Sequence, residues 1–231
     1  MKLIKVVFII LSLLYLNGCA HSIDITPKTD LIKSSLENMP KIQKSVGYFI
    51  PETLINTQVN SRGGGGDSVN YYPYRDMANA FEVMLSSVFE KVTQLNNSND
   101  VGVDYVIRPE IVTDSFSTSS ITWPPTNFTV NLAGKITDPT EKQIKIIKVI
   151  GEGQAEYSEF FSERGLAGMR AMEDALVKMK RSLFDINYEN IAINNKSESV
   201  ERLESLKGLN ERGLITAEEY AIKKREILDG M

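Results

Sequence analysis

The sequence predicts an α+β protein, in which a mostly antiparallel sheet carries two helices on one face and a small helical hairpin follows. Three observations predict it. Short apolar runs are typical of strands, two long apolar stripes recur at helical spacing, and a third stretch near the C-terminus has its own leucine stripe. The body, residues 46–185, gives the order β-α-β-β-β-α and is expected to form a two-layer sandwich.

The first strand and the first long helix of the body are expected within residues 46–95. Residues 46–50 form a short apolar run that ends at Pro51, which is typical of a buried strand. Residues 76–95 repeat apolar side chains at spacings of three and four, which predicts an amphipathic helix. The turn-forming residues 96–100 are expected to end this helix.

Three strands and a second helix complete the body. Residues 105–112 are rich in β-branched side chains, and residues 128–137 alternate between apolar and polar side chains. Residues 144–150 supply a return strand, so these last two strands are expected to form a hairpin. A second apolar stripe from Leu166 to Phe184 predicts a helix, and the polar, asparagine-rich residues 186–198 are interpreted as a linker.

The N-terminus has the pattern of a signal peptide. Lys2 and Lys5 precede an apolar run of 11 residues, Val6 to Leu16. That run is too short to cross a bilayer, which takes roughly 20 apolar residues in a helix. Residues 1–18 are therefore interpreted as a cleaved signal and not as a membrane span.

The sequence Leu16-Asn17-Gly18-Cys19 resembles the lipobox of bacterial lipoproteins. This resemblance implies cleavage before Cys19, a diacylglycerol on its sulfur and an acyl chain such as palmitate on its amine. Two or more acyl chains give a stable membrane anchor. Since Ala20 is not the aspartate associated with inner-membrane retention, the resemblance implies the periplasmic face of the outer membrane. An ordinary secretory signal with a chance cysteine is the alternative.

Residues 19–45 are interpreted as a tether that lifts the body from the lipid. Cys19 is the only cysteine and His21 the only histidine of the chain. With no further thiol or imidazole, a disulfide, a Ser-His-Asp triad and most zinc sites are excluded. We therefore expect no metal, no cofactor and no enzymatic activity.

The charge of the chain also limits its partners. After removal of residues 1–18 the chain keeps 24 basic residues, since Lys2 and Lys5 leave the total of 26, against 30 acidic ones. The resulting net charge of −6 does not favour nucleic acid, which binds to basic surfaces.

Residues 199–231 form a separate C-terminal module. A leucine stripe predicts one helix, Gly213 suits the left-handed position after its end, and Thr216 with Glu219 fits a capping box that begins a second. The residues expected to contact a partner or a second copy are Leu203, Leu206, Leu209, Leu214, Ile215, Tyr220, Ile227 and Leu228.

This module resembles the bacterial SHOCT domain, a short C-terminal domain, over residues 203–228. The spaced leucines, the turn Gly213-Leu214-Ile215-Thr216, the acidic pair and Tyr220 carry the likeness. It implies oligomerisation or partner contact. A helical hairpin of this size buries too little apolar surface to be firmly stable alone. Its stripe must pack on its own domain, on a second copy or on a partner.

Several other segments offer candidate sites. The run Gly63–Gly66 precedes a helix but lacks the lysine spacing of a phosphate loop, so it is interpreted as a mobile loop. A tyrosine cluster with the sole tryptophan offers a ligand-contact surface, with packing on the sheet edge as the alternative; its residues are Tyr71, Tyr72, Tyr74 and Trp123. Four glutamates near the second helix are interpreted as a solvated face and not as an acid-base pair: Glu152, Glu156, Glu159 and Glu163.

The order of elements in the body is similar to the small α/β domains of outer-membrane assembly lipoproteins, among them those of lipopolysaccharide transport and peptidoglycan-synthase activation. A similarity of architecture does not by itself establish function. The leading hypothesis is a non-catalytic lipoprotein that assembles with envelope proteins or with itself. The rival hypothesis is a lipoprotein that binds a glycan, lipid or peptide through the tyrosine and tryptophan loops.

Overall fold

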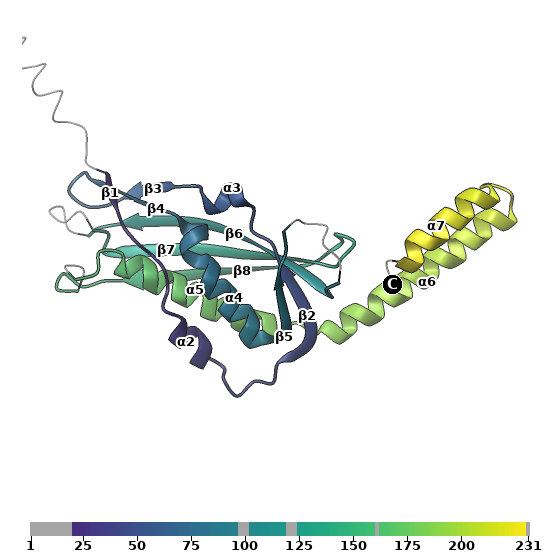
Figure 1. Cartoon of the computed structure of the whole chain (residues 1–231), viewed down its shortest axis with the longest axis horizontal. Coiled ribbons are helices and arrows are strands. Elements are labelled where there is room, and N and C mark those ends of the chain that lie inside the picture. The colour runs from purple at the N-terminus through teal and green to yellow at the C-terminus, as the bar shows by residue number, and fades with distance from the viewer. Residues whose placement is uncertain (1–19, 97–101, 119–123, 160–161, 230–231) are drawn as a thin grey trace, which may run out of the picture.

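The computed structural model describes residues 20–96, 102–118, 124–159 and 162–229, and for residues 189–198 and 229 the backbone alone. It has an α+β body with a helical hairpin at one end (Figure 1). The predicted fold class is confirmed: the strands are mostly antiparallel, and two long helices, α4 and α5, pack against each other beside the sheet.

The main sheet has five strands in the order β5-β2-β6-β7-β8. Strands β6, β7 and β8 run antiparallel in long register, and β2 is parallel to both β5 and β6. The predicted hairpin is therefore present as β7 and β8. The strand bounds are Ile42–Tyr48 for β2, Phe89–Gln94 for β5, Tyr105–Phe116 for β6, Asn127–Thr137 for β7 and Gln143–Gln154 for β8.

The first long helix, α4, spans Pro73–Val88, so the helix expected over residues 76–95 ends earlier than predicted. Phe89 to Gln94 form strand β5 instead, which pairs in parallel with β2. The apolar spacing continues through Phe89 and Val92, but the ladder to β2 decides the backbone conformation there. Tertiary pairing has overridden a local helical pattern.

The second long helix, α5 (Leu166–Phe184), lies very close to strand β8. A Cβ atom on Gly153 would stand 2.0 Å from the Ala167 carbonyl oxygen, and one on Gly151 would stand 2.1 Å from that of Ala171. Glycine on the strand and alanine on the helix together allow this approach. The predicted helix is thus confirmed, at a separation that only these small residues permit.

Residues 20–45 are not the tether that the sequence suggested. Strand β1 (Ala20–Ser22) pairs with β4, and helix α2 (Thr29–Ser34) lies against α4 and α5. Ile25 and Ile32 are fully buried in the main core. The interpretation was wrong because a few apolar side chains, such as Ile25 and Ile32, are enough to bury a segment when other elements of the body pack around them.

A small sheet and a short helix complete the body. Strand β3 (Val59–Arg62) and β4 (Ser68–Tyr71) form an antiparallel hairpin, and β1 adds in parallel on the far side of β4. Helix α3 (Glu52–Ile55) precedes this hairpin.

The C-terminal helices are α6 (Tyr188–Glu211) and α7 (Ala217–Asp229). The segment 186–198, interpreted as a linker, is helical from Tyr188 onward. Tyr188 is buried, with its ring 5.7 Å from that of Phe89 and 5.1 Å from that of Tyr105. Helix α6 therefore begins in the core of the body and leads to a hairpin that lies away from it (Figure 1).

Candidate interaction surfaces

Two of the three tyrosines in the cluster, Tyr71 and Tyr74, are part of the core and do not offer the ligand surface suggested by the sequence. Tyr71 is buried, and its hydroxyl bonds the hydroxyls of Thr113 at 2.7 Å and Ser61 at 3.1 Å. Tyr74 is also buried, and its hydroxyl accepts the Ile111 N–H at 3.1 Å. Burial raises the pKa of Tyr71. These two rings join the small sheet and α4 to β6, so the packing alternative is the correct one.

Tyr72 keeps a half-buried position, with the Arg75 guanidinium 3.7 Å from its ring centre. This cation-π contact occupies one face of the ring. Trp123, the other predicted contact residue, lies outside the described residues, as does Cys19. Of the predicted ligand surface, Tyr72 alone is both described and partly accessible.

The glycine run has a structural explanation in the turn between β3 and β4. Gly65 and Gly66 have φ angles of 67° and 88°, which L side chains rarely adopt. The Gly63 N–H donates to the Asp67 carbonyl at 3.0 Å and closes the turn. The Asp67 carboxylate lies 3.2 Å from His21 Nε2 on β1. The run is therefore a hairpin turn that needs positive φ.

The glutamates near α5 do not form an acid-base pair. Glu159 accepts from the Arg170 guanidinium at 2.8 and 2.9 Å, and this pairing lowers the pKa of Glu159 to about 2. Glu163 lies 3.6 Å from the Lys28 ammonium, and Glu152 and Glu156 are exposed. Within the described residues there is also no cluster of metal-ligating side chains.

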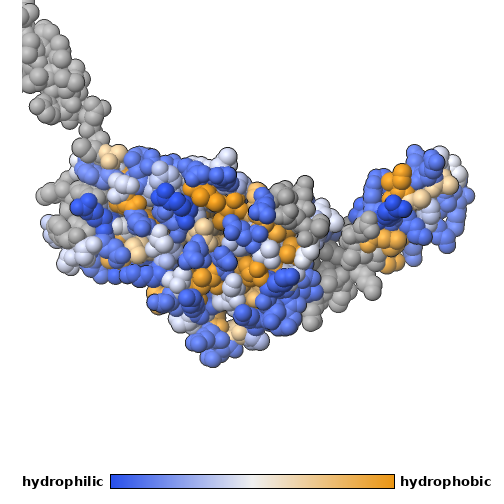
Figure 2. Space-filling view, viewed as in Figure 1, coloured by the Kyte–Doolittle hydropathy of each residue, from blue (hydrophilic) through white to orange (hydrophobic). Residues whose placement is uncertain are grey.

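The hairpin of α6 and α7 leaves most of its apolar side chains in contact with solvent. Of the predicted contact residues only Leu206 is buried, whereas Leu214 and Leu228 are 63% and 48% exposed. The remaining predicted contacts are half-buried: Leu203, Leu209, Ile215, Tyr220 and Ile227. The main contacts of α7 are with α6. Figure 2 shows hydrophobic residues on the visible surface of the hairpin.

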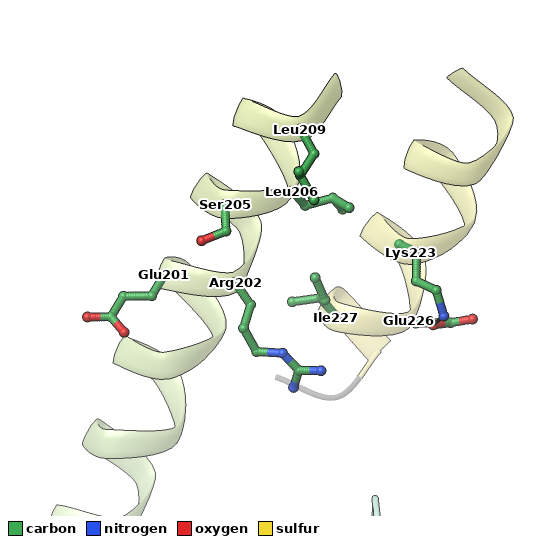
Figure 3. A pocket seen from close by; sticks show the side chains of 8 residues that line it. All are labelled: Glu201, Arg202, Ser205, Leu206, Leu209, Lys223, Glu226 and Ile227. Atoms are coloured by element: carbon green, nitrogen blue, oxygen red, sulfur yellow. Dashed lines mark hydrogen bonds and ion pairs between the residues drawn. The ribbon is translucent and has the colours of Figure 1, made fainter. Parts of the chain in front are cut away.

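A groove of about 420 Å³ lies between the two hairpin helices. Leu206, Leu209 and Ile227 point into the space between the helices, whereas Glu201 points away from α7 (Figure 3). Polar residues line the remainder of the groove: Arg202, Ser205, Lys223 and Glu226. The two helices thus meet along a narrow apolar seam with charged margins.

The predicted turn and cap of the hairpin are confirmed. Gly213 has a φ of 67°, and the Gly213 N–H donates to the Asn210 carbonyl. The Glu219 N–H donates to the Thr216 hydroxyl at 3.2 Å, and the Thr216 N–H donates to the Glu219 carboxylate at 2.8 Å. This reciprocal pair begins α7 as a capping box does.

The outer edge of β8 is a feature that sequence reasoning missed. Three side chains one helical turn apart on α5 bond three alternate residues of this strand: Lys178 donates to the Ile150 carbonyl, Asp174 accepts the Glu152 N–H, and Arg170 donates to the Gln154 carbonyl. The distances are 2.8, 2.9 and 2.7 Å. The sequence signal was the pair Gly151 and Gly153 beside a helix with alanine at every fourth position.

Comparison with known proteins does not assign a family. No family model matches the chain, and no curated protein matches it. The crystal structure of a Xanthomonas campestris protein of family DUF330 aligns with a TM-score of 0.43 and 13% identity, covering 78% of this chain and 98% of that one. The crystal structure of an uncharacterized protein aligns with a TM-score of 0.37 and 8% identity, covering 72% and 97%. Neither likeness is high enough to support a statement about function.

None of the helices in the described part of the chain is both long enough and apolar enough to cross a membrane.

Proposed function

We propose that this chain is a non-catalytic lipoprotein of the cell envelope that assembles through its C-terminal hairpin. One observation carries the proposal: the hairpin lies away from the body and presents apolar side chains that neither the body nor its own two helices cover. A surface of this kind on a monomer is typical of a site of protein contact. The resemblance to the SHOCT domain supports the same role.

The proposed occupant of the hairpin surface is a second copy of the hairpin. Besides Leu214 and Leu228, Val200 and Ile222 are exposed, at 42% and 59%. Full burial of a fully exposed side chain of this kind stabilises by about 1.5–3 kcal/mol. These four side chains are 42–63% exposed, so each would contribute about half of that amount. In a symmetric contact each residue counts twice, so the total gain lies within the range of the cost of association, about 4–15 kcal/mol.

The proposed anchor is Cys19, one residue before strand β1. Because Ala20 already pairs with Ser68, a lipid on Cys19 would hold the β1 end of the body directly at the membrane surface, without a stalk. The hairpin lies at the opposite end of the molecule (Figure 1). An anchored body would thus direct its assembly surface away from the lipid. The periplasmic face of the outer membrane remains the proposed location.

The ligand-binding alternative has lost its main support. Tyr71 and Tyr74 hold the core together, and their hydroxyls are already bonded within the protein. We therefore keep assembly as the proposed function.

The assembly role is tested by the solution mass of the purified full chain, measured by light scattering after gel filtration. The double variant Ile222→Asp and Leu228→Asp is expected to lower the mass to that of one chain. Leu31→Asp is the matched control, because Leu31 is 61% exposed but lies on α2 of the body. A parent protein that is already monomeric, or a hairpin variant with the parent mass, would refute self-association.

The anchor is tested separately by labelling cells with an alkyne analogue of palmitate. The parent chain is expected to take up label and to sediment with membranes. Cys19→Ser is expected to lose the label and to leave the membrane fraction. Label that persists in this variant would place the acylation elsewhere and refute the proposed anchor.

A further inference from the structure

The outer edge of strand β8 is divided into a closed half and an open half. In the main sheet β8 is the last strand beyond β7. Its C-terminal half, from Ile150 to Gln154, is closed by the three bonds from α5. An edge strand that keeps unpaired backbone groups can template another strand.

The bonds from α5 show which backbone groups face outward. Ile150, Glu152 and Gln154 each use an N–H or carbonyl toward α5, so the even-numbered residues of β8 face away from β7. The register with β7 runs without a bulge from Lys145 to Gln154. Because the two sides alternate along a strand, the N–H and carbonyl groups of Ile146 and Lys148 also face outward.

No residue in the described part of the chain bonds these outward groups of Ile146 and Lys148. The helix leaves them uncovered because the three α5 side chains that bond the edge of β8 end at Lys178. That residue bonds Ile150, which lies in the closed half. Among the described residues, the N–H and carbonyl groups of the open half are therefore available to donate and accept hydrogen bonds with an added strand.

The side chains around the open half select its occupant. Lys145 and Lys148 are exposed on the strand itself, and Lys135 on β7 lies in register with Ile146. Ile146 and Ile150 are 41% and 54% exposed, which gives the same edge an apolar component. A second copy of β8 would bring its own lysines against these ones, and like charges across a strand pair destabilise it.

We propose that the open half of β8 binds an extended, acidic segment of a partner polypeptide as an added strand. Backbone hydrogen bonds to Ile146 and Lys148 would give the register. Because side chains alternate along a strand, carboxylates of the partner would pair with Lys148 on the outer face of the sheet and with Lys145 on the face toward α5. Recognition of an extended peptide at a sheet edge follows this general mode. The site is on the body and is independent of the hairpin, so it remains testable if the hairpin proposal fails.

The first test measures amide hydrogen exchange of the full chain with a capped peptide of eight residues, Glu-Glu-Val-Val repeated twice, so that an added strand carries carboxylates on both of its faces. The amides of Ile146 and Lys148 are expected to exchange at least tenfold more slowly with saturating peptide. Those of Ile147 and Val149, which face β7, serve as internal controls and are expected to change little. No slowing at Ile146 and Lys148 with millimolar peptide would overturn the proposal.

Backbone methylation of the peptide separates strand addition from simple charge attraction. Two further peptides have the same sequence but carry N-methyl groups, one on the odd-numbered amides and the other on the even-numbered amides. Each has one edge that cannot donate hydrogen bonds. We expect the form that is methylated on the edge facing β8 to bind at least tenfold more weakly than the parent peptide. Equal binding of the parent peptide and both methylated forms would overturn the strand-addition model.

Charge variants test the partner chemistry. Lys145→Glu with Lys148→Glu is expected to weaken peptide binding at least tenfold, and the retained protection of Ile147 would show that the strand is still folded. Lys33→Glu with Lys41→Glu is the matched control, since both lysines are exposed on the N-terminal segment. An equal loss of peptide binding in the two double variants would overturn specific recognition of an acidic polypeptide. So would phosphatidylglycerol vesicles that slow the exchange of the Ile146 amide as much as the peptide does.

Discussion

Glu173 and Lys180, two turns apart on helix α5, hold opposite ends of helix α2. The Glu173 carboxylate accepts the Lys28 N–H at 2.7 Å, just before α2 begins. The Lys180 ammonium donates to carbonyls at the other end, those of Ile32 at 2.9 Å and of Ser35. A negative group at a helix N-terminus and a positive group at its C-terminus both complement the helix dipole. This pair fixes the segment that follows the proposed anchor.

Removing the Lys180 ammonium is expected to destabilise the body. Lys180→Met keeps most of the side-chain volume but leaves the carbonyls at the end of α2 buried without a donor, at a cost of roughly 1–3 kcal/mol. Lys33→Met is the control, because Lys33 lies on α2 itself and its side chain is exposed. Urea unfolding at neutral pH measures both variants. Equal stabilities would show that the Lys180 contacts contribute nothing.

The glycines of β8 are expected to be sensitive to a single added methyl group. Gly153→Ala would force its Cβ into the Ala167 carbonyl, and such overpacking costs about 1–3 kcal/mol. Gly208→Ala is the control and is expected to stabilise, since no atom lies within 4 Å of a Cβ there and alanine favours a helix by about 0.5–1 kcal/mol. Amide hydrogen exchange measures both variants: it should become faster in α5 for Gly153→Ala and slower in α6 for Gly208→Ala. Unchanged hydrogen exchange of the α5 amides in Gly153→Ala would contradict the close approach of β8 to α5.

Local signals were sufficient for the elements whose partners are close in sequence. The alternation of residues 128–137 and the turn after Asp138 predicted the β7–β8 hairpin, and the Thr216–Glu219 spacing predicted the cap of α7. In each case the groups that satisfy the backbone lie within a few residues of each other, or on the adjacent strand. Such contacts leave a periodic pattern that can be seen in the sequence.

The elements that were missed depend on distant partners. Residues 20–45 contain too few apolar side chains to predict burial. They are held by Glu173 and Lys180, which follow their bonding partners by 145 and 148 residues in the chain. Strand β5 continues a helical spacing but pairs with β2, which lies more than forty residues earlier. Tyr71 was taken for a surface aromatic because its hydroxyl partner Thr113 cannot be identified from local sequence.

Asp76 is expected to make the stability of the body depend on pH. It is buried in the first turn of α4, and its Oδ2 has no partner among the described residues. Burial, aided by the charge of Asp24, raises the pKa of Asp76 above the ordinary value of 3.8. The folded state then binds more protons than the unfolded chain between the two pKa values. The free energy of unfolding therefore falls as pH rises through that interval.

Asp76→Asn is expected to remove this loss of stability, so the variant should gain on the parent as pH rises from about 4. Urea unfolding over a pH series measures the difference. Asp30→Asn removes one exposed carboxylate from α2 and controls for net charge. Parallel pH profiles for parent and Asp76→Asn would contradict the raised pKa.

The Glu159 carboxylate offers a second pH-dependent group, of the opposite sign. Hydrogen bonds from Arg170 lower the pKa of Glu159 from 4.5 to about 2. Its contribution to stability is present above pH 4.5 and is lost as pH falls toward 2. Arg170→Gln is expected to return the pKa toward 4.5, measured by NMR titration of the carboxyl carbon. Lys178→Gln, which removes a cation that pairs with Asp174, should leave Glu159 unchanged.

The cap of α7 is expected to control both the order of the hairpin and its proposed assembly. Thr216→Ala removes the hydroxyl that accepts the Glu219 N–H, and loss of such a cap costs about 0.5–2 kcal/mol. The amides of the first turn of α7 should exchange faster. Ser205→Ala is the control, because it removes an exposed hydroxyl from the interior of α6 and leaves the cap intact.

The same variant connects the cap to oligomeric state. Ile222 and Leu228 belong to α7, so a frayed helix presents them in many conformations and must be ordered again when a second copy binds. That ordering opposes association, and Thr216→Ala is expected to raise the dissociation constant of the oligomer several-fold while Ser205→Ala leaves it unchanged. Faster exchange in α7 with an unaltered dissociation constant would mean that the contact between copies does not use this helix.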